Sequence, residues 1–168
     1  MTAAGRVSER SAADEARIRP VTEADVPSVH AMIAAIFADY GYRFDPAHED
    51  THLLRPHSHF PGQGGAFWVA TRADTVIGCV GAIPHSADGF GELKALYVAP
   101  AARRCGLGER LTRHCIAFLQ NAGCPHVRLW SDTKFADAHR LYERLGFRRI
   151  ARRDVRAVND YSEFCYEL

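Results

Sequence analysis

The sequence has 168 residues, enough for one domain with its own hydrophobic core, and its 47% apolar content is ordinary for a globular protein. A formal net charge of +1, with 24% charged residues, gives no electrostatic footprint of the kind that draws proteins to polyanions or to anionic membranes. We therefore expect neither nucleic acid nor a membrane among the partners.

The sequence also indicates the cellular compartment, because it lacks features typical of membrane and secreted proteins. No apolar run approaches the ~20 residues needed to cross a bilayer, and residues 1–17 lack the apolar core of a secretory signal. The five cysteines are odd in number, widely spaced and without a C-x-x-C pair, which favours reduced thiols over disulfides or a thiolate metal site. The sequence therefore predicts a cytoplasmic protein.

The fold is predicted to begin near Arg17, because residues 1–16 are small and polar without periodicity and read as a flexible N-terminal tail. A short strand over 16–20 comes first. Thr22 then offers an N-cap with an acidic residue three positions later, and apolar residues at helical spacing predict a helix that ends near Gly41.

Residues 41–65 are rich in His, Pro, Gly and aromatic residues, and we expect at most a short helix over 46–54, ended by Arg55-Pro56, before a turn at 61–65. Three runs of strand character follow, over 66–72, 75–84 and 92–98. The tight Ala73-Asp74 connection joins the first two and predicts an antiparallel meander.

The C-terminal half alternates between the two periodicities. Apolar positions predict a helix from Gly106 to the cap around Gly123, a strand over 126–130, a helix over 132–146, and closing strands over 147–153 and 162–168. About six or seven strands and three or four helices in mixed order indicate an α/β or α+β domain, with helices packed on a central sheet.

The most informative stretch is ELKALYVAPAARRCGLGERL, residues 92–111. A strand runs into a proline turn, two arginines, a Gly-x-Gly pair and the start of a helix. Helix starts carry unpaired N–H groups and partial positive charge, and glycine lets the backbone approach a ligand closely. This junction therefore predicts a site for an anion such as a pyrophosphate, with added charge from Arg103 and Arg104.

Two phosphate-binding motifs fail here: the Walker pattern is absent, and a Rossmann G-x-G-x-x-G from Gly106 meets Leu111. The stretch instead resembles the V-x-P-x-x-[RQ]-[RG]-x-G-x-[GA] motif of the GNAT acyltransferase superfamily. Its matching positions are Val98, Pro100, Arg103, Arg104, Gly106 and Gly108. A second family element, AHRLYERLGF, matches at Ala138, Tyr142, Gly146 and Phe147, so the resemblance covers residues 17–168.

The resemblance implies a GNAT fold: a mixed, mostly antiparallel sheet of six to seven strands flanked by three to four helices. It implies an N-acetyltransferase that uses acetyl-CoA, without a metal, to acetylate a primary amine of a small molecule or peptide by direct attack in a ternary complex. The pantetheine arm would lie between a bulged fourth strand and a splayed fifth strand. The cofactor-binding residues it implies are Leu96, Tyr97, Val98, Arg103, Arg104, Cys105, Gly106, Leu107, Gly108, Phe135 and Ala138.

One departure concerns Phe135, which stands where many relatives of this family carry an Asn that contacts the pantetheine arm. We expect the cofactor to bind without that contact, because backbone and phosphate contacts are the main anchors in this family. Cys105 is open to two interpretations. A helix start and two arginines would lower its pKa and make it reactive, or it fills an unconstrained loop position.

Acetyl transfer requires two proton transfers, one to the leaving thiolate and one from the acceptor amine, and each needs a residue to carry it out. We assign Tyr142 as the acid that protonates the leaving thiolate, against the alternative of a buried tyrosine that holds its helix on the sheet. Glu92, at the start of the motif strand, is the candidate base, against a solvated strand-end carboxylate with a water chain in its place. Asp39, Asp45 and Glu49 lie in a region where they would attract a cationic acceptor.

The letters HEDTH, residues 48–52, spell the zinc motif H-E-x-x-H. The predicted helix there is too short for a zincin, and Ser58 stands where the metzincin extension requires a third histidine. We expect residues 48–52 to form a wall of the acceptor pocket instead, where His48 or His52 could relay a proton. The alternatives to an acetyltransferase are a non-catalytic acyl-CoA sensor and, more distantly, a zinc hydrolase. The sequence does not determine the oligomeric state and is compatible with a homodimer.

Overall fold

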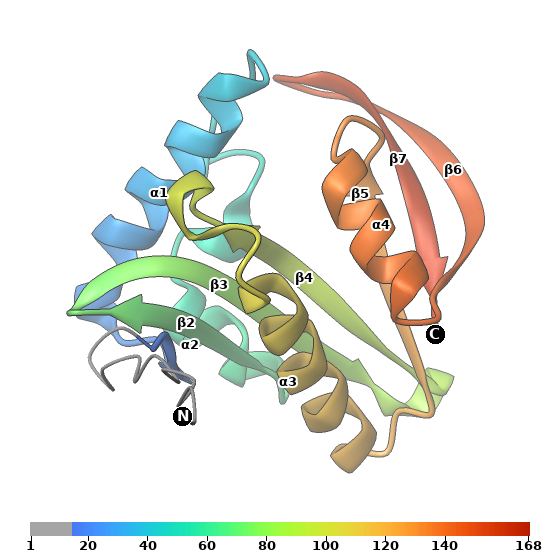
Figure 1. Ribbon diagram of the computed structural model, residues 1–168. Helices are drawn as coiled ribbons and strands as arrows, with labels where there is room; N and C mark the ends of the chain where they lie inside the picture. Colours follow the sequence, from blue (N-terminus) through green and yellow to red (C-terminus); the bar gives the residue numbers. More distant parts are fainter. Residues whose placement is uncertain (1–14) are drawn as a thin grey trace, which may run out of the picture.

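The computed structural model describes residues 15–168, so the tail predicted over residues 1–14 lies outside the described part. Within it, seven strands form one sheet in the order β1-β2-β3-β4-β5-β7-β6, and four α-helices flank the sheet (Figure 1). In chain order the elements are β1 (Arg17–Pro20), α1 (Val26–Asp39), α2 (Pro56–His59), β2 (Ala66–Arg72), β3 (Thr75–His85), β4 (Phe90–Val98), α3 (Leu107–Asn121), β5 (His126–Asp132), α4 (Ala136–Arg144), β6 (Arg148–Arg156) and β7 (Asp160–Glu167).

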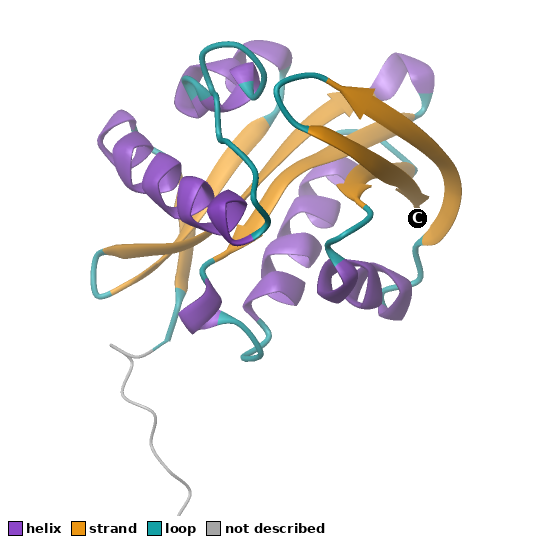
Figure 2. Ribbon diagram, turned by 90° about the horizontal axis from the view of Figure 1, so that it is seen from above, coloured by secondary structure: helices purple, strands orange, loops and turns teal. Residues whose placement is uncertain are grey.

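The sheet is mixed and mostly antiparallel, as the resemblance implies, because β4 and β5 form its one parallel pair among the described strands. Helices cover both faces (Figure 2). Strand β2 shows how the core is divided: Phe67 and Val69 pack with α1 on one face, and Trp68 and Ala70 pack with α3 on the other. Successive side chains of a strand point to opposite faces, so a strand covered on both sides is apolar throughout.

The start of the first long helix confirms the predicted cap. The Thr22 backbone N–H and hydroxyl both donate to the Asp25 carboxylate at 2.8 Å, and Arg19 of β1 pairs with the same carboxylate at 2.7 Å. These hydrogen bonds, that from Arg19 first, hold the pKa of Asp25 well below its usual range. The helix ends at Asp39, and Gly41, two residues later, has φ of +73°.

Two helix boundaries differ from the prediction. Pro56 begins α2 instead of ending a preceding helix, since proline at a first helical position loses no intrahelical hydrogen bond. Residues 46–54 form only a turn and a 3-10 turn at Thr51–Leu53. Helix α4 begins at Ala136 and not near 132, because Asp132 holds a turn by accepting a hydrogen bond from the Lys134 backbone N–H at 2.8 Å.

Strand β4 carries an extra residue that shapes the site. Cys79 of β3 pairs with Tyr97, but Gly81 pairs with Lys94, so β4 has three residues where β3 has two. Ala95 lies within this bulge with φ of +52°, a left-handed conformation that is uncommon for a residue with a Cβ. The bulged fourth strand implied by the resemblance is therefore present.

The fifth strand parts from β4 immediately after they pair. The parallel pairing covers only Phe90–Glu92 of β4 and His126–Arg128 of β5, and beyond it the strands separate (Figure 1). Separated strands leave backbone groups of β4 unpaired on that side.

None of the helices between residues 15 and 168 has the length and apolar character that crossing a bilayer demands.

Gly81 provides a test of the packing opposite the bulge. A Cβ placed on Gly81 would lie 2.6 Å from Cζ of Phe60 and 2.9 Å from Cδ2 of Phe67, too close for real carbon contacts. We expect Gly81→Ala to lower the free energy of unfolding by about 1–3 kcal/mol in chemical denaturation. Gly62→Ala is the matched control, since nothing lies within 4 Å of its added Cβ. Equal effects of both substitutions would contradict this packing.

Candidate active site

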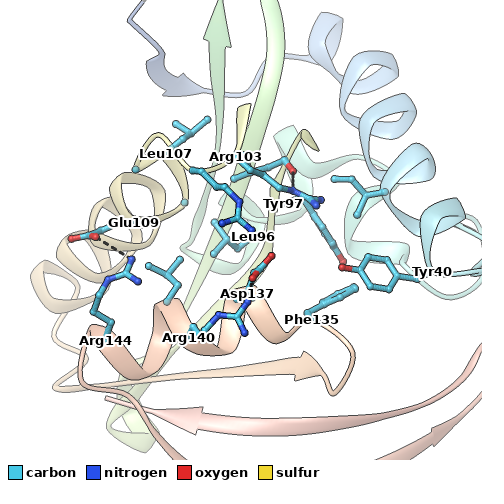
Figure 3. A pocket seen from close by; sticks show the side chains of 17 residues that line it. Tyr40, Leu96, Tyr97, Arg103, Leu107, Glu109, Phe135, Asp137, Arg140 and Arg144 are labelled. Atoms are coloured by element: carbon cyan, nitrogen blue, oxygen red, sulfur yellow. Dashed lines mark hydrogen bonds and ion pairs between the residues drawn. The ribbon is translucent and has the colours of Figure 1, made fainter. Parts of the chain in front are cut away.

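Two cavities meet at β4. The first has a volume of about 370 Å³ and lies between β4, α3 and α4 (Figure 3), and the second, of about 430 Å³, lies between β4, the 48–52 turn and β7. Four residues line both cavities: Leu96, Tyr97, Phe135 and Ala138. A molecule that fills the first cavity can therefore present one end to a molecule in the second.

The first cavity gathers ten of the eleven residues expected to bind the cofactor. They are Leu96, Tyr97, Val98, Arg103, Arg104, Gly106, Leu107, Gly108, Phe135 and Ala138. Cys105 is the exception, because its exposed side chain does not line the cavity and its thiol lies 2.9 Å from the Ala102 carbonyl oxygen. These positions are 96–98, 103–104 and 106–108 on the motif segment, and 135 and 138 at and just after the N-cap of α4.

The turn between β4 and α3 has the geometry of an anion site. Arg104 and Gly106 both have positive φ, +60° and +80°, and Gly106 is the N-cap of α3. Left-handed residues before a helix start turn successive backbone N–H groups toward one point, where the helix dipole adds positive charge. Arg103 is positioned by a 3.1 Å hydrogen bond from its Nε to the Val98 carbonyl oxygen.

The Val98 backbone faces the gap between β4 and β5. The Ala99 N–H donates to the carbonyl oxygen of Ile77 in β3 at 2.9 Å, so this N–H points toward β3. Backbone N–H groups alternate direction along a strand, and the Val98 N–H therefore points the other way, into the space that β5 has left. This donor is free to meet a carbonyl group or an extended chain lying along β4.

Helix α4 contributes charged residues that the sequence interpretation missed. Asp137, Arg140 and Arg144 line the first cavity, and Arg144 reaches Glu109 of α3 at 3.5 Å (Figure 3). Their spacing of three and four residues places them on one helix face. That spacing is visible in the sequence, but only the packing of α4 beside α3 shows that the face points to the first cavity.

Phe135 and Tyr40 close the first cavity at the end nearest the second. Their rings meet edge to face with centroids 4.8 Å apart, which joins the end of α1 to the start of α4 (Figure 3). Aromatic pairs of this kind contribute about 0.5–1.5 kcal/mol beyond the area they bury. Phe135 thus supplies an apolar wall where the family resemblance implies a hydrogen-bonding Asn.

The second cavity is aromatic and acidic. Its ring-bearing lining residues include Phe37, Tyr42, Tyr97, Trp130, Tyr142 and Tyr161. Its carboxylates are Glu49, Asp50, Glu92, Asp132 and Glu163, whereas its two permanently cationic side chains are Lys94 and Arg153. Both cations are already paired, Lys94 with Glu92 at 2.9 Å and Arg153 with Glu163 at 2.7 Å.

Tyr142 is buried on α4 and lines the second cavity. Its ring packs against Phe147 and Tyr166, each with centroids 5.7 Å away. Burial, with smaller contributions from Cys115 and Tyr166, raises the pKa of Tyr142 above its usual value. The hydroxyl is therefore protonated at physiological pH, and it also has the packing role that the alternative interpretation gave it.

Glu92 lies in a pair of ionic contacts. Its carboxylate is 2.9 Å from Lys94 Nζ and 3.5 Å from His85 Nε2. Both Glu92 and Lys94 line the second cavity, two residues apart on the same face of β4. The carboxylate predicted as a base thus lines the second cavity, in contact with a cation.

Comparison with known proteins identifies the family. The acetyltransferase (GNAT) family matches residues 29–147. This chain belongs to that family. Among curated relatives, mycothiol acetyltransferase of Acidothermus cellulolyticus is 33% identical over 150 residues, which cover 80% of this chain and 45% of the relative. The GNAT chain described here thus spans less than half of that relative's length.

Solved structures show the same fold. An acetyltransferase of the GNAT family from Staphylococcus aureus Mu50 superposes with a TM-score of 0.79 at 21% identity, covering 91% of this chain and 98% of that one. The Salmonella typhimurium protein yncA, solved with its cofactor acetyl-CoA, gives a TM-score of 0.71 at 19% identity, covering 91% and 92%. The GNAT fold expected from the two motifs is confirmed.

The two histidines of the HEDTH segment have different neighbours in the structure. The turn places the His48 ring on Asp45 at 2.9 Å, and the His52 ring lies beside that of His59, with centroids 6.4 Å apart. Between residues 15 and 168, no three His, Cys, Asp or Glu side chains are grouped to hold a metal ion. Burial, with smaller contributions from Lys94 and His59, lowers the pKa of His52 to about 3. His48 and His52 both line the second cavity, as expected of a pocket wall.

The sequence interpretation missed Asp50. Of the three acids it singled out nearby, Glu49 lines the second cavity, whereas Asp45 is buried in ion pairs with His48 and Arg43 and Asp39 is exposed outside both cavities. Asp50 lines the second cavity half-buried. Burial raises the pKa of Asp50 to about 6, and the neighbouring acids Glu49 and Asp45 add to the rise. No sequence pattern distinguishes it from Glu49.

This raised pKa gives a stability test. The pKa of Asp50 is about 6 in the folded chain against 3.8 for an ordinary aspartate, so ionisation lowers the free energy of unfolding as the pH rises through this window. We expect Asp50→Asn to raise it by about 1–3 kcal/mol above the window and to leave it unchanged below the window. Urea titrations at several pH values measure this.

The exposed Asp39→Asn is the control with the same charge change, and we expect it to shift stability by less than about 0.5 kcal/mol at any pH. A stability difference between Asp50→Asn and the unmodified chain that does not vary with pH would contradict the raised pKa.

Proposed function

We propose that this protein transfers the acetyl group of acetyl-CoA to a primary amine of a small molecule or peptide, by direct attack in a ternary complex. The observation that carries the proposal is the anion-binding turn at residues 103–108, which opens onto the bulged end of β4 beside the gap left by β5. Membership of the GNAT family supports it, as does the acetyl-CoA bound by the structurally similar yncA.

The cofactor would lie across the first cavity. Backbone N–H groups at the start of α3 and the guanidinium groups of Arg103 and Arg104 suit its pyrophosphate. The pantetheine arm would run along β4 toward Leu96 and Tyr97, which line both cavities. The thioester then lies where the two cavities meet, next to the Val98 N–H that points into the gap.

The chemistry follows from this placement. The amine nitrogen attacks the thioester carbonyl carbon, and negative charge develops on the carbonyl oxygen. A fixed donor such as the Val98 N–H, in a site shielded from water, stabilises that charge. As the C–S bond breaks, the protonated Tyr142 hydroxyl gives its proton to the thiolate. Tyr142 suits this role because it lines the second cavity together with the shared residues Leu96 and Tyr97.

The acceptor should be cationic before it reacts. The second cavity has five carboxylates, and its two permanent cations are each paired with one of them, so its field favours an ammonium group. Glu92 is the base expected from the sequence, and Glu49 would help attract the acceptor. The cysteines are free thiols, which supports a cytoplasmic location.

Arg104→Glu tests the cofactor site. Reversing the charge of a residue that lines the anion turn should weaken acetyl-CoA binding at least about tenfold in calorimetry, since charge-assisted contacts to phosphate are strong. Arg55→Glu makes the same change of net charge at an exposed position outside both cavities and should leave the affinity unchanged. Equal affinity in all three proteins would remove the turn from cofactor binding.

Tyr142→Phe tests the acid. We expect kcat for CoA thiol release, measured across a panel of amines, to fall by roughly 10²-fold, the usual contribution of a general acid. Acetyl-CoA affinity should not change, because Tyr142 lines only the second cavity. Tyr166→Phe, which alters a buried neighbour outside both cavities, controls for lost packing. Unchanged turnover would leave Tyr142 with a packing role alone, and tight binding of acetyl-CoA without turnover of any amine would favour the sensor.

A further inference from the structure

Asp50 occupies a fixed position in the acceptor cavity. Its backbone N–H donates to the Asp45 carbonyl oxygen at 3.1 Å, and its own carbonyl oxygen accepts from the Leu53 N–H at 2.7 Å. Leu53 is completely buried, so the turn is attached to the core on one side. The side chain lines the second cavity together with Tyr142 and the shared residues Leu96 and Tyr97. Asp50 is therefore held in the space where an acceptor amine would lie.

The other carboxylates of this cavity already have strong partners. Glu92 pairs with Lys94, and Glu163 pairs with Arg153. Glu49 accepts a hydrogen bond from the Val158 backbone N–H, and Asp132 accepts one from the Lys134 backbone N–H at 2.8 Å. Each of these four carboxylates therefore already has an ion-pair or hydrogen-bond partner within the protein.

Among residues 15–168, no cation and no donor side chain contacts the Asp50 carboxyl group, and a hydrogen bond with the Asp45 backbone acts on it. The groups that act on it are Glu49 and Asp45 from its own turn, Tyr97 from β4 and Tyr161 from β7, with His52 and Lys94 elsewhere in the cavity lining. The two tyrosines have raised pKa values, mainly through burial, and are neutral. Burial, with smaller contributions from the two neighbouring acids, therefore raises the pKa of Asp50 to about 6, and the Asp45 backbone partly opposes this rise.

We propose that the Asp50 carboxylate is the base that takes the proton from the acceptor ammonium group. This inference rests on the proposed acetyl transfer and assigns to Asp50 the role that the sequence suggested for Glu92. A base whose pKa is close to the working pH combines a high ionised fraction with useful basicity.

The proton balance is complete. Asp50 removes one proton from the ammonium group and later releases it to water through the open cavity. The freed amine forms the N–C bond, and the C–S bond breaks. Tyr142 gives its proton to the sulfur and regains one from the nitrogen of the tetrahedral intermediate. The products are an amide, CoA thiol and one released proton.

The test compares the pH dependence of kcat/KM for the unmodified enzyme, Asp50→Asn and Glu92→Gln with the best acceptor of an amine panel. The unmodified enzyme should show an acidic limb near pH 6 that reports Asp50. In Asp50→Asn we expect kcat/KM at about pH 7 to fall by roughly 10²-fold or more, and to rise with pH only as free amine forms. Glu92→Gln should keep the acidic limb.

An aminooxy analogue of the same acceptor separates base catalysis from damage to the fold. This nucleophile is neutral at about pH 7 and needs no base, so Asp50→Asn should act on it within about threefold of the unmodified enzyme. Asp50→Glu retains a carboxylate and should retain the acidic limb, which keeps the proposal testable if the Asn variant does not fold.

The outcomes are distinct. Three results would overturn the assignment of Asp50 and leave acetyl transfer standing. The first is an equal loss of kcat/KM in Asp50→Asn with both nucleophiles, and the second is an unchanged pH profile in that variant. The third is loss of the acidic limb in Glu92→Gln instead of in Asp50→Asn. Absence of turnover of any amine by the unmodified enzyme, despite acetyl-CoA binding, would overturn acetyl transfer itself and the assignment with it.

Discussion

The extra residue in β4 is the constraint on which the site depends. With Ala95 in a left-handed conformation, the strand changes direction, and its pairing with β5 stops at Glu92. The buried Cys79 thiol donates to the Ala95 carbonyl oxygen at 3.3 Å and supports the bulge from the neighbouring strand. A bulge leaves backbone groups unpaired and turns the strand. The Val98 N–H is available to a ligand because the sheet is incomplete at this point.

Two cavities of opposite character meet at that opening. The first is bounded by a helix start and paired arginines, which suit an anion, and the second has more carboxylates than cations, which suits an ammonium group. Tyr97 and Phe135 lie between them. This separation of charge allows an anionic cofactor and a cationic acceptor to be bound side by side while their reactive ends meet at an aromatic boundary.

Much of the fold and of the cofactor site could be predicted from the sequence, because the signals are local. The strand, proline turn, arginines and glycines of residues 92–108 are contiguous, and each backbone requirement selects a residue type, as Gly106 does at φ of +80°. Boundaries were less predictable. Pro56 begins a helix where it was expected to end one, since proline is compatible with both roles and the surrounding packing selects one.

The sequence by itself determined the order of the elements, the family and the turn at residues 103–108 that is proposed to bind an anion, because periodicity, capping and motif spacing are properties of neighbouring residues. Only the tertiary structure decided which carboxylate stands apart from the others. Asp50 and Glu49 are adjacent and carry the same carboxyl group. Glu49 accepts a hydrogen bond from Val158, over a hundred positions away, whereas Asp50 lines the cavity with no cation of residues 15–168 in contact with its carboxyl group. Burial and partners of this kind come from segments distant in the chain, and they set the pKa values on which acid and base chemistry depends.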